Sequence, residues 1–448
     1  MSELSLNTQN SESWIDRLFS PTVKAVFLAT VVGVAFFSEH DVSMSLKEGF
    51  VADIEDQEAW AEGGNTLRRV TFPGIAALGM LSLLLVRGKK FRLNLPTVFI
   101  AIYLLWAGAS ASWSIDPGTT IRRFFVVLCC TIGCYGFCKL IDLKDAVFAA
   151  LLVSLAFLGL GVAVEIVLGT FRPHVGDYRF AGSMHPNIQA ANLAIGSIAA
   201  YIMARIKPNL KVVFYGIFGF LFLFLILTKC RSATAAVPIS LGFIWLASQP
   251  VKSIVIGVVS AFWVVSFACL ICLVTEVNPI AENSNVLLLG RQEETGESLT
   301  GRLPLWEDLI EYIAVKPWQG YGFKAFWNPR HITDIAIGQE WTISEAHSSY
   351  VDTTLQLGIV GTLLLSLTAI SMFFFSAITY RKTLQPGYLF LVGGVAFCIV
   401  RGFTESGLNG ASPITAFLFL SLAAHCWNGD RISTDTDHNL DDHLSQIA

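Results

Sequence analysis

His347 is the side chain of this sequence that is best placed to take up a proton. It follows Glu345 and Ala346 and comes directly before a long apolar stretch. Ser344 is a plausible N-cap, and Glu345 a first-turn acid, of the helix that this stretch predicts. The positive end of such a helix favours neutral imidazole, the form that accepts a proton, and Glu345 could orient the ring. The competing interpretation is an inert surface histidine.

The sequence predicts no metal site and no cofactor. No two histidines are spaced as metal ligands on one helical turn would be. Cys130, Cys134 and Cys138 recur every four residues on one helix face, a pattern that could suggest a soft metal. No histidine or carboxylate accompanies them, and cysteine behaves as a small apolar residue, so we interpret this face as a site of close helix packing.

Basic residues near the ends of apolar stretches form a second group of candidate functional side chains. Guanidinium groups bind phosphate oxygens through paired hydrogen bonds of fixed geometry, so such a set suits a phosphate-bearing lipid head group. Alternatively, each side chain reaches for membrane phosphates or pairs with Asp116, Asp177 or Glu405. The members of the group are Arg122, Arg123, Arg172, Arg179, Lys229, Arg231, Arg302 and Arg401.

The elements that must position these residues are membrane helices. The chain has 448 residues, of which 54% are hydrophobic and 14% charged, and its mean hydropathy is +0.59. This composition predicts an all-α polytopic membrane protein, a helical bundle with roughly twelve spans of the length that crosses a bilayer. The predicted spans are 22–38, 70–87, 95–112, 119–138, 146–169, 188–206, 210–228, 232–248, 252–275, 353–380, 387–403 and 411–427.

Lysine and arginine in the short loops predict the orientation, because positive charge near span ends resists translocation. The clearest cluster is Arg87, Lys89, Lys90 and Arg92. On the same side by alternation lie Lys139, Lys144, Arg205, Lys207, Lys211, Lys252, Arg381 and Lys382. We assign this side to the cytoplasm and expect both termini there. The predicted order is a cytoplasmic tail (1–21), nine spans (22–275), a large periplasmic loop (276–347), three spans (348–427) and an acidic cytoplasmic tail (428–448).

The large loop contains one amphipathic helix. Trp306, Leu309, Ile310 and Ile313 share one face of residues 303–316, which predicts a helix that lies on the membrane interface or caps a cavity. Arg302 would then precede this helix, near the membrane surface. Pro317 stops the helix, and Gly320 and Gly322 bracket a tight turn at Tyr321, a supporting element of the candidate site.

Four segments together resemble the hallmark segments of the O-antigen ligase and polymerase superfamily, a group of multi-span glycosyltransferases. The resemblance extends over roughly residues 95 to 410, and it rests on the order and common side of these segments. They are Trp113-Ser114-Ile115-Asp116-Pro117 with Arg122-Arg123, Arg179-Phe180-Ala181-Gly182 with Pro186-Asn187, Gly301-Arg302-Leu303-Pro304-Leu305-Trp306 with Lys316 to Gly322, and Glu345 to Tyr350 with Leu357 to Gly361.

The resemblance implies glycan transfer from a polyprenyl-pyrophosphate donor to a sugar hydroxyl, without metal or nucleotide sugar. His347 matches the loop histidine expected to act as general base. Arg302 and Arg231 match the arginines expected to hold the pyrophosphate, and Arg122 and Arg179 belong to the same basic set. The chain departs from the family pattern at Ser348 and Cys230, where asparagine and serine are common. These departures bear on the acceptor more than on the reaction.

We therefore expect an exopolysaccharide-type polymerase at the outer face of a bacterial cytoplasmic membrane. A ligase that moves finished glycan to lipid A-core or another acceptor needs the same residues. A secondary transporter or lipid-linked glycan flippase is the alternative from another class, although no internal repeat supports it. The expected partners are the lipid-linked donor, a glycan or lipid-linked acceptor, the bilayer and envelope polysaccharide-assembly proteins. A net charge of −4 and the lack of a basic stripe argue against nucleic acid.

Overall fold

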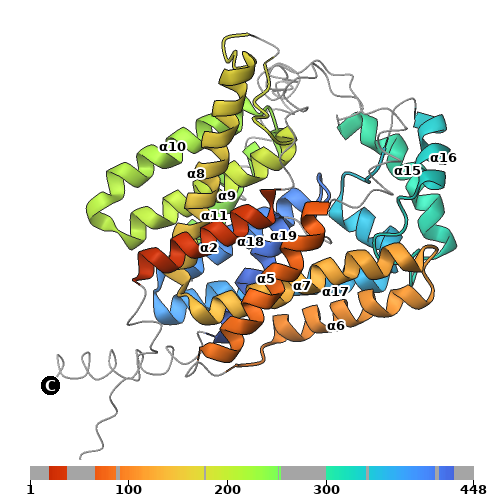
Figure 1. The fold of residues 1–448 in the computed structure, drawn as a ribbon, viewed down its shortest axis with the longest axis horizontal. Helices are drawn as coiled ribbons and strands as arrows, with labels where there is room; N and C mark the ends of the chain where they lie inside the picture. The colour runs from red at the N-terminus through yellow and green to blue at the C-terminus, as the bar shows by residue number, and fades with distance from the viewer. Residues whose placement is uncertain are drawn as a thin grey trace, which may run out of the picture.

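The computed structural model describes residues 20–37, 66–86, 91–175, 178–250, 252–253, 299–339, 343–408 and 413–427. Within these ranges the chain forms helices and turns and no β-strand, as predicted (Figure 1). The helices are α2 (Pro21–Ala35), α5 (Thr66–Leu85), α6 (Leu95–Ala109), α7 (Pro117–Leu140), α8 (Leu143–Leu168), α9 (Pro186–Ile206), α10 (Lys211–Leu227), α11 (Arg231–Ser248), α15 (Leu299–Val315), α16 (Pro329–Gln339), α17 (Ser349–Thr383), α18 (Pro386–Gly402) and α19 (Pro413–Trp427).

The starts of many helices follow from local sequence. A proline occupies the first or second position of α2, α6, α7, α9 and α18, where its missing N–H is not needed and its fixed φ suits a helix. Side chains of Ser20, Asn94 and Asp116 accept hydrogen bonds from the exposed N–H groups of the first turn. These caps fix where each span begins.

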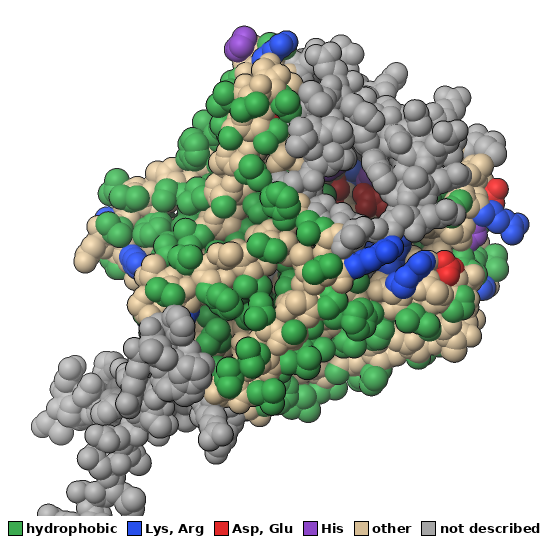
Figure 2. Space-filling model, in the orientation of Figure 1, with side chains coloured by type: hydrophobic (Ala, Val, Ile, Leu, Met, Phe, Trp, Pro, Cys, Tyr) green, Lys and Arg blue, Asp and Glu red, His purple; other side chains and the backbone are tan. Residues whose placement is uncertain are grey.

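The helices identify a multi-pass membrane protein. Among the described residues, six helical segments are long and apolar enough to cross a bilayer: Leu67–Leu85, Leu95–Ser112, Pro117–Leu140, Leu143–Leu168, Pro208–Leu227 and Ser349–Thr383. Hydrophobic side chains cover much of the surface in Figure 2. Helices occupy the predicted span ranges except 252–275, nearly all of which lies outside the described residues. The total of twelve spans stays a prediction.

Small residues let α5 and α7 approach closely, as is usual between helices in lipid. A Cβ added to Gly136 would lie 2.1 Å from the carbonyl oxygen of Gly79. On another face of α7, the Sγ atoms of Cys134 and Cys138 lie 3.6 Å and 3.3 Å from the carbonyl oxygens of Ala416 and Leu420 on α19. These buried thiols therefore act in helix packing, as the sequence suggested.

A break in α17 attaches the segment after α15 to the spans. Gly358 has φ +67° inside α17, so nearby carbonyls lose their helical partners. The N–H groups of Tyr321 and Gly322 donate to the carbonyls of Leu355 and Gln356, both at 2.9 Å, and Ile359 donates to Pro317 at 2.8 Å. A non-helical backbone is tolerated at such a position because neighbouring protein groups satisfy it.

Helix α15 differs in two ways from its prediction. It begins at Leu299, so Arg302 lies within its first turn and not before its start. Ile310 is 60% exposed, whereas Leu305 and Leu309 are fully buried, because the aromatic cluster beneath the helix packs against the face centred on these leucines. In Figure 1, α15 and α16 lie at one end of the bundle, beside the ends of α6, α7 and α17.

Candidate active site

His347 lies in the turn before α17 with φ +49°, a conformation uncommon for residues other than glycine. Hydrogen bonds hold the residues on both sides of it. The carbonyl of Ala346 accepts from Trp306 Nε1 at 2.8 Å, and its N–H donates to Asp352 Oδ1 at 3.2 Å. Ser348 Oγ donates to the carbonyl of Gly402 at 3.4 Å. Such conformations persist where the surroundings fix them, and they cluster at functional sites.

Asp352 joins the segments that surround this turn. It is 1% exposed, and its Oδ1 also accepts from Trp327 Nε1 at 2.7 Å. Its Oδ2 accepts a hydrogen bond from the hydroxyl of Ser406. Sequence reasoning missed this residue, although a lone carboxylate in the first turn of a long apolar helix is itself a signal of function.

The predicted cap of α17 is wrong. Ser348, and not Ser344, is the N-cap, and its Oγ accepts from the N–H of Val351 at 3.5 Å. Glu345 and His347 therefore precede the helix and do not belong to its first turn. The contacts of Ala346 with Trp306 and Asp352 hold residues 345–347 outside the helix.

Glu345 controls the protonation of His347. Its Oε1 lies 3.2 Å from His347 Nδ1. Burial lowers the pKa of His347, but the hydrogen bond and charge of Glu345 outweigh it and hold this pKa above its usual value. Burial raises the pKa of Glu345, yet the pairing with His347 brings it down to about 2. This shift is opposite in direction to the one expected from the helix end, because the carboxylate contact outweighs it.

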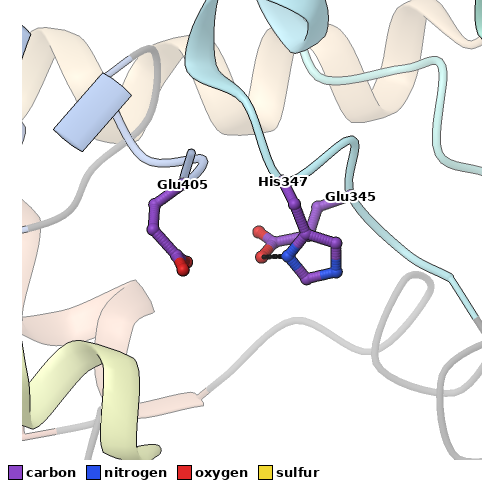
Figure 3. A group of neighbouring side chains, drawn as sticks. All are labelled: Glu345, His347 and Glu405. Atoms are coloured by element: carbon purple, nitrogen blue, oxygen red, sulfur yellow. Dashed lines mark ion pairs between the residues drawn. The ribbon is translucent and has the colours of Figure 1, made fainter. Parts of the chain in front are cut away.

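Glu405 faces this pair from the segment after α18 (Figure 3). Ligand-type atoms of Glu345, His347 and Glu405 lie within 4.8 Å of one another. Two buried arginines hold Glu405: Arg302 Nη2 lies 3.5 Å from its Oε1, and Arg401 Nη2 lies 3.9 Å from its Oε2. Arg302 also donates to the carbonyl of Thr404. An imidazole, two carboxylates and two guanidinium groups thus gather in one cluster, in which Glu405 and the arginines are buried and Glu345 and His347 are partly exposed.

Arg179 reaches the cluster through Asn187 at the start of α9. Arg179 Nη2 donates to Asn187 Oδ1 at 2.7 Å, and Asn187 Nδ2 donates to Glu405 Oε1 at 3.1 Å. The carbonyl of Asn187 accepts from Arg401 Nη2 at 3.0 Å. The structure therefore brings together Arg179, Arg302, Glu345 and His347 of the predicted set.

The other two predicted arginines, Arg231 and Arg122, lie near the starts of α11 and α7. Arg231 is the first residue of α11, and Arg179 Nε donates at 2.9 Å to the carbonyl of Thr228, shortly before it. A shared site for Arg231 and His347 stays a prediction. Arg122 is exposed and donates to Thr119 Oγ1 at 2.9 Å within α7. Its neighbour Arg123 donates to the carbonyl of Lys324 at 3.2 Å.

Tyr321 acts at a distance from the cluster. It is 7% exposed within the aromatic cluster under α15, and its hydroxyl donates to the carbonyl of Tyr312 at 2.9 Å. Its own carbonyl accepts from the N–H of Ile115 at 3.0 Å, and Trp113 Nε1 donates to the carbonyl of Gln319 at 3.0 Å. Tyr321 therefore supports the packing that joins the segments around Trp113 and Gly320.

Glu405 and Arg401 were not among the predicted site residues. From the sequence, Glu405 was interpreted only as a pairing partner for arginines. Arg401 was interpreted only as one of the basic residues near span ends. The signal that could have identified both is their spacing, because oppositely charged residues four apart lie on one helical face. Such a pair at the end of an apolar helix is costly and therefore informative.

The described residues contain one group that could hold a metal ion, Glu345, His347 and Glu405. These side-chain types are suitable ligands for a divalent cation. Glu405, however, already contacts Arg302, Arg401 and Asn187. Because two guanidinium groups occupy the positions from which a cation would compensate this carboxylate, the set fits a metal poorly.

Comparison with known proteins adds two findings. A family model described as O-antigen ligase matches residues 216–366, a range that includes Arg231, Arg302 and His347. The chain is also 24% identical over 341 residues to the exopolysaccharide production protein ExoQ of Rhizobium meliloti (strain 1021). That similarity covers 72% of this chain and 73% of the relative. With the helical fold and the meeting of the four hallmark segments, these findings support the similarity of the chain to the O-antigen ligase and polymerase superfamily.

Proposed function

We propose that this protein is a membrane glycosyltransferase that polymerises polyprenyl-pyrophosphate-linked oligosaccharides at the outer face of the cytoplasmic membrane. The observation that carries the proposal is the pairing of His347 with Glu345 beside the buried cluster of Arg302, Arg401 and Glu405. A partly exposed base beside a set of buried cations suits a reaction that removes a proton and releases an anion.

In the proposed reaction, His347 accepts the proton of the acceptor hydroxyl. Glu345 contacts Nδ1, so a proton held at Nδ1 leaves Nε2 as the nitrogen that accepts. The hydroxyl oxygen forms a bond to the anomeric carbon of the donor while the bond from that carbon to the pyrophosphate oxygen breaks. The proton ends on the imidazole, and the electron pair leaves with the polyprenyl pyrophosphate.

The arginines stabilise the leaving pyrophosphate. The Nε atoms of Arg302 and Arg401 are buried and have no hydrogen-bond partner among the described residues. Donors in such positions suit phosphate oxygens, which prefer several charge-assisted hydrogen bonds. Arg179 lies behind them through Asn187, and Arg231 and Arg122 complete the proposed basic set. This arrangement supplies the charge stabilisation that metal ions provide in other transferases, so we propose a metal-independent reaction without a cofactor.

Polymerase and ligase differ in the acceptor. A polymerase joins one lipid-linked repeat to another, and a ligase transfers finished glycan to a different molecule. The relative named for exopolysaccharide production favours the polymerase, whereas the matching family model is described as O-antigen ligase. We place the polymerase first because the similarity to that relative covers most of the chain, as against residues 216–366 for the family model.

The test is glycan transfer by the purified protein in bilayer vesicles. The vesicles receive a lipid-pyrophosphate oligosaccharide but no nucleotide sugar and no divalent metal, and lipid-linked products are separated by length. Wild-type protein is expected to form longer lipid-linked chains. The His347→Ala variant is expected to lose on the order of 100- to 10,000-fold in rate, as removal of a general base does.

Other outcomes of this experiment would indicate a ligase, a flippase or a metal-dependent enzyme. Donor consumption only after addition of a different glycan acceptor would identify a ligase. Donor movement across the vesicle membrane without transfer would identify a flippase and overturn the glycosyltransferase proposal. Activity that returns only with divalent metal would contradict the metal-independent reaction and turn attention to Glu345, His347 and Glu405.

A further inference from the structure

The segment that carries Arg179 is fastened to α8 by a single buried carboxylate. Glu165 lies near the C-terminal end of α8 and is 2% exposed. Its Oε1 accepts from the N–H groups of Ala181 at 3.0 Å and Gly182 at 2.7 Å. Its Oε2 accepts from the hydroxyl of Tyr178 at 2.5 Å. These three donors come from residues on both sides of Arg179.

Two glycines make this contact possible. Gly182 has φ +65°, and a Cβ at this position would lie 2.7 Å from the Cα of Gly161 on α8. A side chain there would push the segment off the helix. Because Gly182 packs directly on Gly161, its N–H reaches the Glu165 carboxylate. The backbone of this segment therefore has one position relative to α8.

The position of the backbone decides where Arg179 points. Arg179 donates to the carbonyl of Thr228 and to Asn187, and Asn187 donates to Glu405. Glu165 thus holds the backbone on both sides of Arg179, and hydrogen bonds and an ion pair run on from the Arg179 side chain through Asn187 to Glu405 and Arg302. Fixed networks of this kind hold substrate-binding groups within the narrow tolerance that a transfer reaction needs.

We propose that Glu165 is a positioning residue that fixes Arg179 for binding of the donor pyrophosphate. The inference rests on the proposed function, and it assigns to a carboxylate inside a membrane helix the task of placing a cation in the site. Glu165 itself does not contact substrate in this proposal. Its effect passes through the backbone of residues 178–182 to the Arg179 guanidinium.

Substitution of Glu165 should leave the end of α8 intact. The carbonyl of Glu165 accepts from the N–H groups of Thr170 at 2.9 Å and Phe171 at 3.2 Å, and these bonds do not involve the side chain. Glu165→Ala therefore removes the acceptors of the 178–182 segment alone. Glu165→Gln keeps one oxygen for the two N–H groups and is the conservative variant. Tyr178→Phe removes one of the three donors.

Ser154→Ala on the same helix is the matched control. Ser154 is 2% exposed, and its Oγ donates to the carbonyl of Asn192 on α9 at 2.9 Å. It lies about 16 Å along α8 from Glu165 at the usual helical rise. This variant loses a buried hydrogen bond of α8 without any contact to residues 178–182.

The experiment measures donor KM and kcat for glycan transfer, together with direct binding of farnesyl pyrophosphate to the detergent-solubilised protein. Glu165→Ala is expected to raise donor KM and weaken pyrophosphate binding on the order of 10- to 100-fold. Glu165→Gln should recover most of the loss, and Ser154→Ala should stay within roughly two-fold of wild type. The pH dependence governed by His347 should not change in any of them.

A double-mutant cycle decides whether the effect passes through Arg179. In an Arg179→Ala background, Glu165→Ala should change binding by no more than roughly two-fold, because the group that it positions is already absent. An undiminished effect of Glu165→Ala in that background would overturn the proposal, and so would wild-type binding by the single variant. Pyrophosphate binding that follows this pattern without any glycan transfer would sustain the role of Glu165 and contradict the proposed function instead.

Discussion

At the scale of single residues, the site depends on which groups neutralise one another. His347 is paired with Glu345, and Arg302 and Arg401 with Glu405. Each charged group has an oppositely charged neighbour before a substrate arrives, and Arg302 and Arg401 share the one carboxylate of Glu405, which leaves positive charge for an anion. A donor pyrophosphate would compete with Glu405 for the arginines, and an acceptor hydroxyl would use the imidazole. The predictions at this scale therefore concern proton affinity and guanidinium geometry.

Glu345→Gln is expected to move the acid limb of the pH–rate profile to lower pH. The Glu345 carboxylate raises the pKa of His347, and only the unprotonated imidazole accepts a proton, so activity rises as pH increases through this pKa. Removing the negative charge lowers the pKa, so a larger fraction of His347 is unprotonated at mildly acidic pH. Glycan transfer measured from mildly acidic to mildly alkaline pH checks the shift. An acid limb that stays in place would show that Glu345 does not set the proton affinity.

Arg302→Lys is expected to slow transfer on the order of 100-fold, the usual loss when a donor to a developing anion is removed. Lysine keeps the charge but cannot reproduce the planar set of donors that now contacts Glu405 and the carbonyl of Thr404. Arg330→Lys is the matched control, because Arg330 is exposed and, within the described part of the chain, forms its ion pair with Asp334 four residues on. Equal transfer rates for the two variants would show that Arg302 does not take part in the reaction.

At the scale of elements, the sequence predicted the positions of the helices well. It predicted the contacts at the helix ends less well. The span at 119–138 corresponds to α7 at 117–140, because apolar length and Pro117 mark it locally. The cap of α17 was misplaced, since Ser344 and Ser348 are both plausible N-caps and contacts from Trp306 and Asp352 decide between them. His347 and Arg302 were identified by their motifs, but their partner Glu405 comes from a distant helix end. Such long-range pairing leaves little local signal.

The break in α17 gives a prediction for one glycine. Gly358→Ala is expected to destabilise the protein and abolish transfer, because a Cβ there would lie 2.1 Å from the carbonyl oxygen of Trp318 and the backbone has φ +67°. This conformation, with ψ −173°, is reached almost only by glycine and costs about 1–3 kcal/mol for a residue with a Cβ, and the clash adds to it. Gly242→Ala in α11 is the control, since among the described residues no heavy atom beyond its own stretch of helix lies within 4 Å of an added Cβ. Thermal unfolding in detergent should separate the two, and equal midpoints would contradict the role of the break.

At the scale of the whole molecule, the two ends of the bundle differ in chemistry. The cluster of His347 and Glu405 lies at the end where α17 begins and α18 ends. At the opposite end of these helices, Arg381 Nη2 donates to the carbonyl of Gln249 at 3.1 Å, and Arg205 Nη1 donates to Ser248 Oγ at 3.2 Å. Basic residues that the sequence assigned to one side of the membrane thus meet at one end of the fold. Arg87, Lys89 and Lys90, which were predicted on the same side, lie outside the described residues.

This separation predicts the orientation of the protein. Loop lysines and arginines remain on the cytoplasmic side, so the end that carries Arg205 and Arg381 should face the cytoplasm and the His347 end should face outward. A fluorescent protein fused after Ala448 is expected to fold and fluoresce, whereas alkaline phosphatase at the same position should be inactive. A phosphatase fusion after Pro317, beyond α15, should be active. The reverse pattern would place His347 in the cytoplasm, where a donor displayed on the outer leaflet could not reach it, and the proposed polymerase would then have to act before its lipid-linked substrate crosses the membrane.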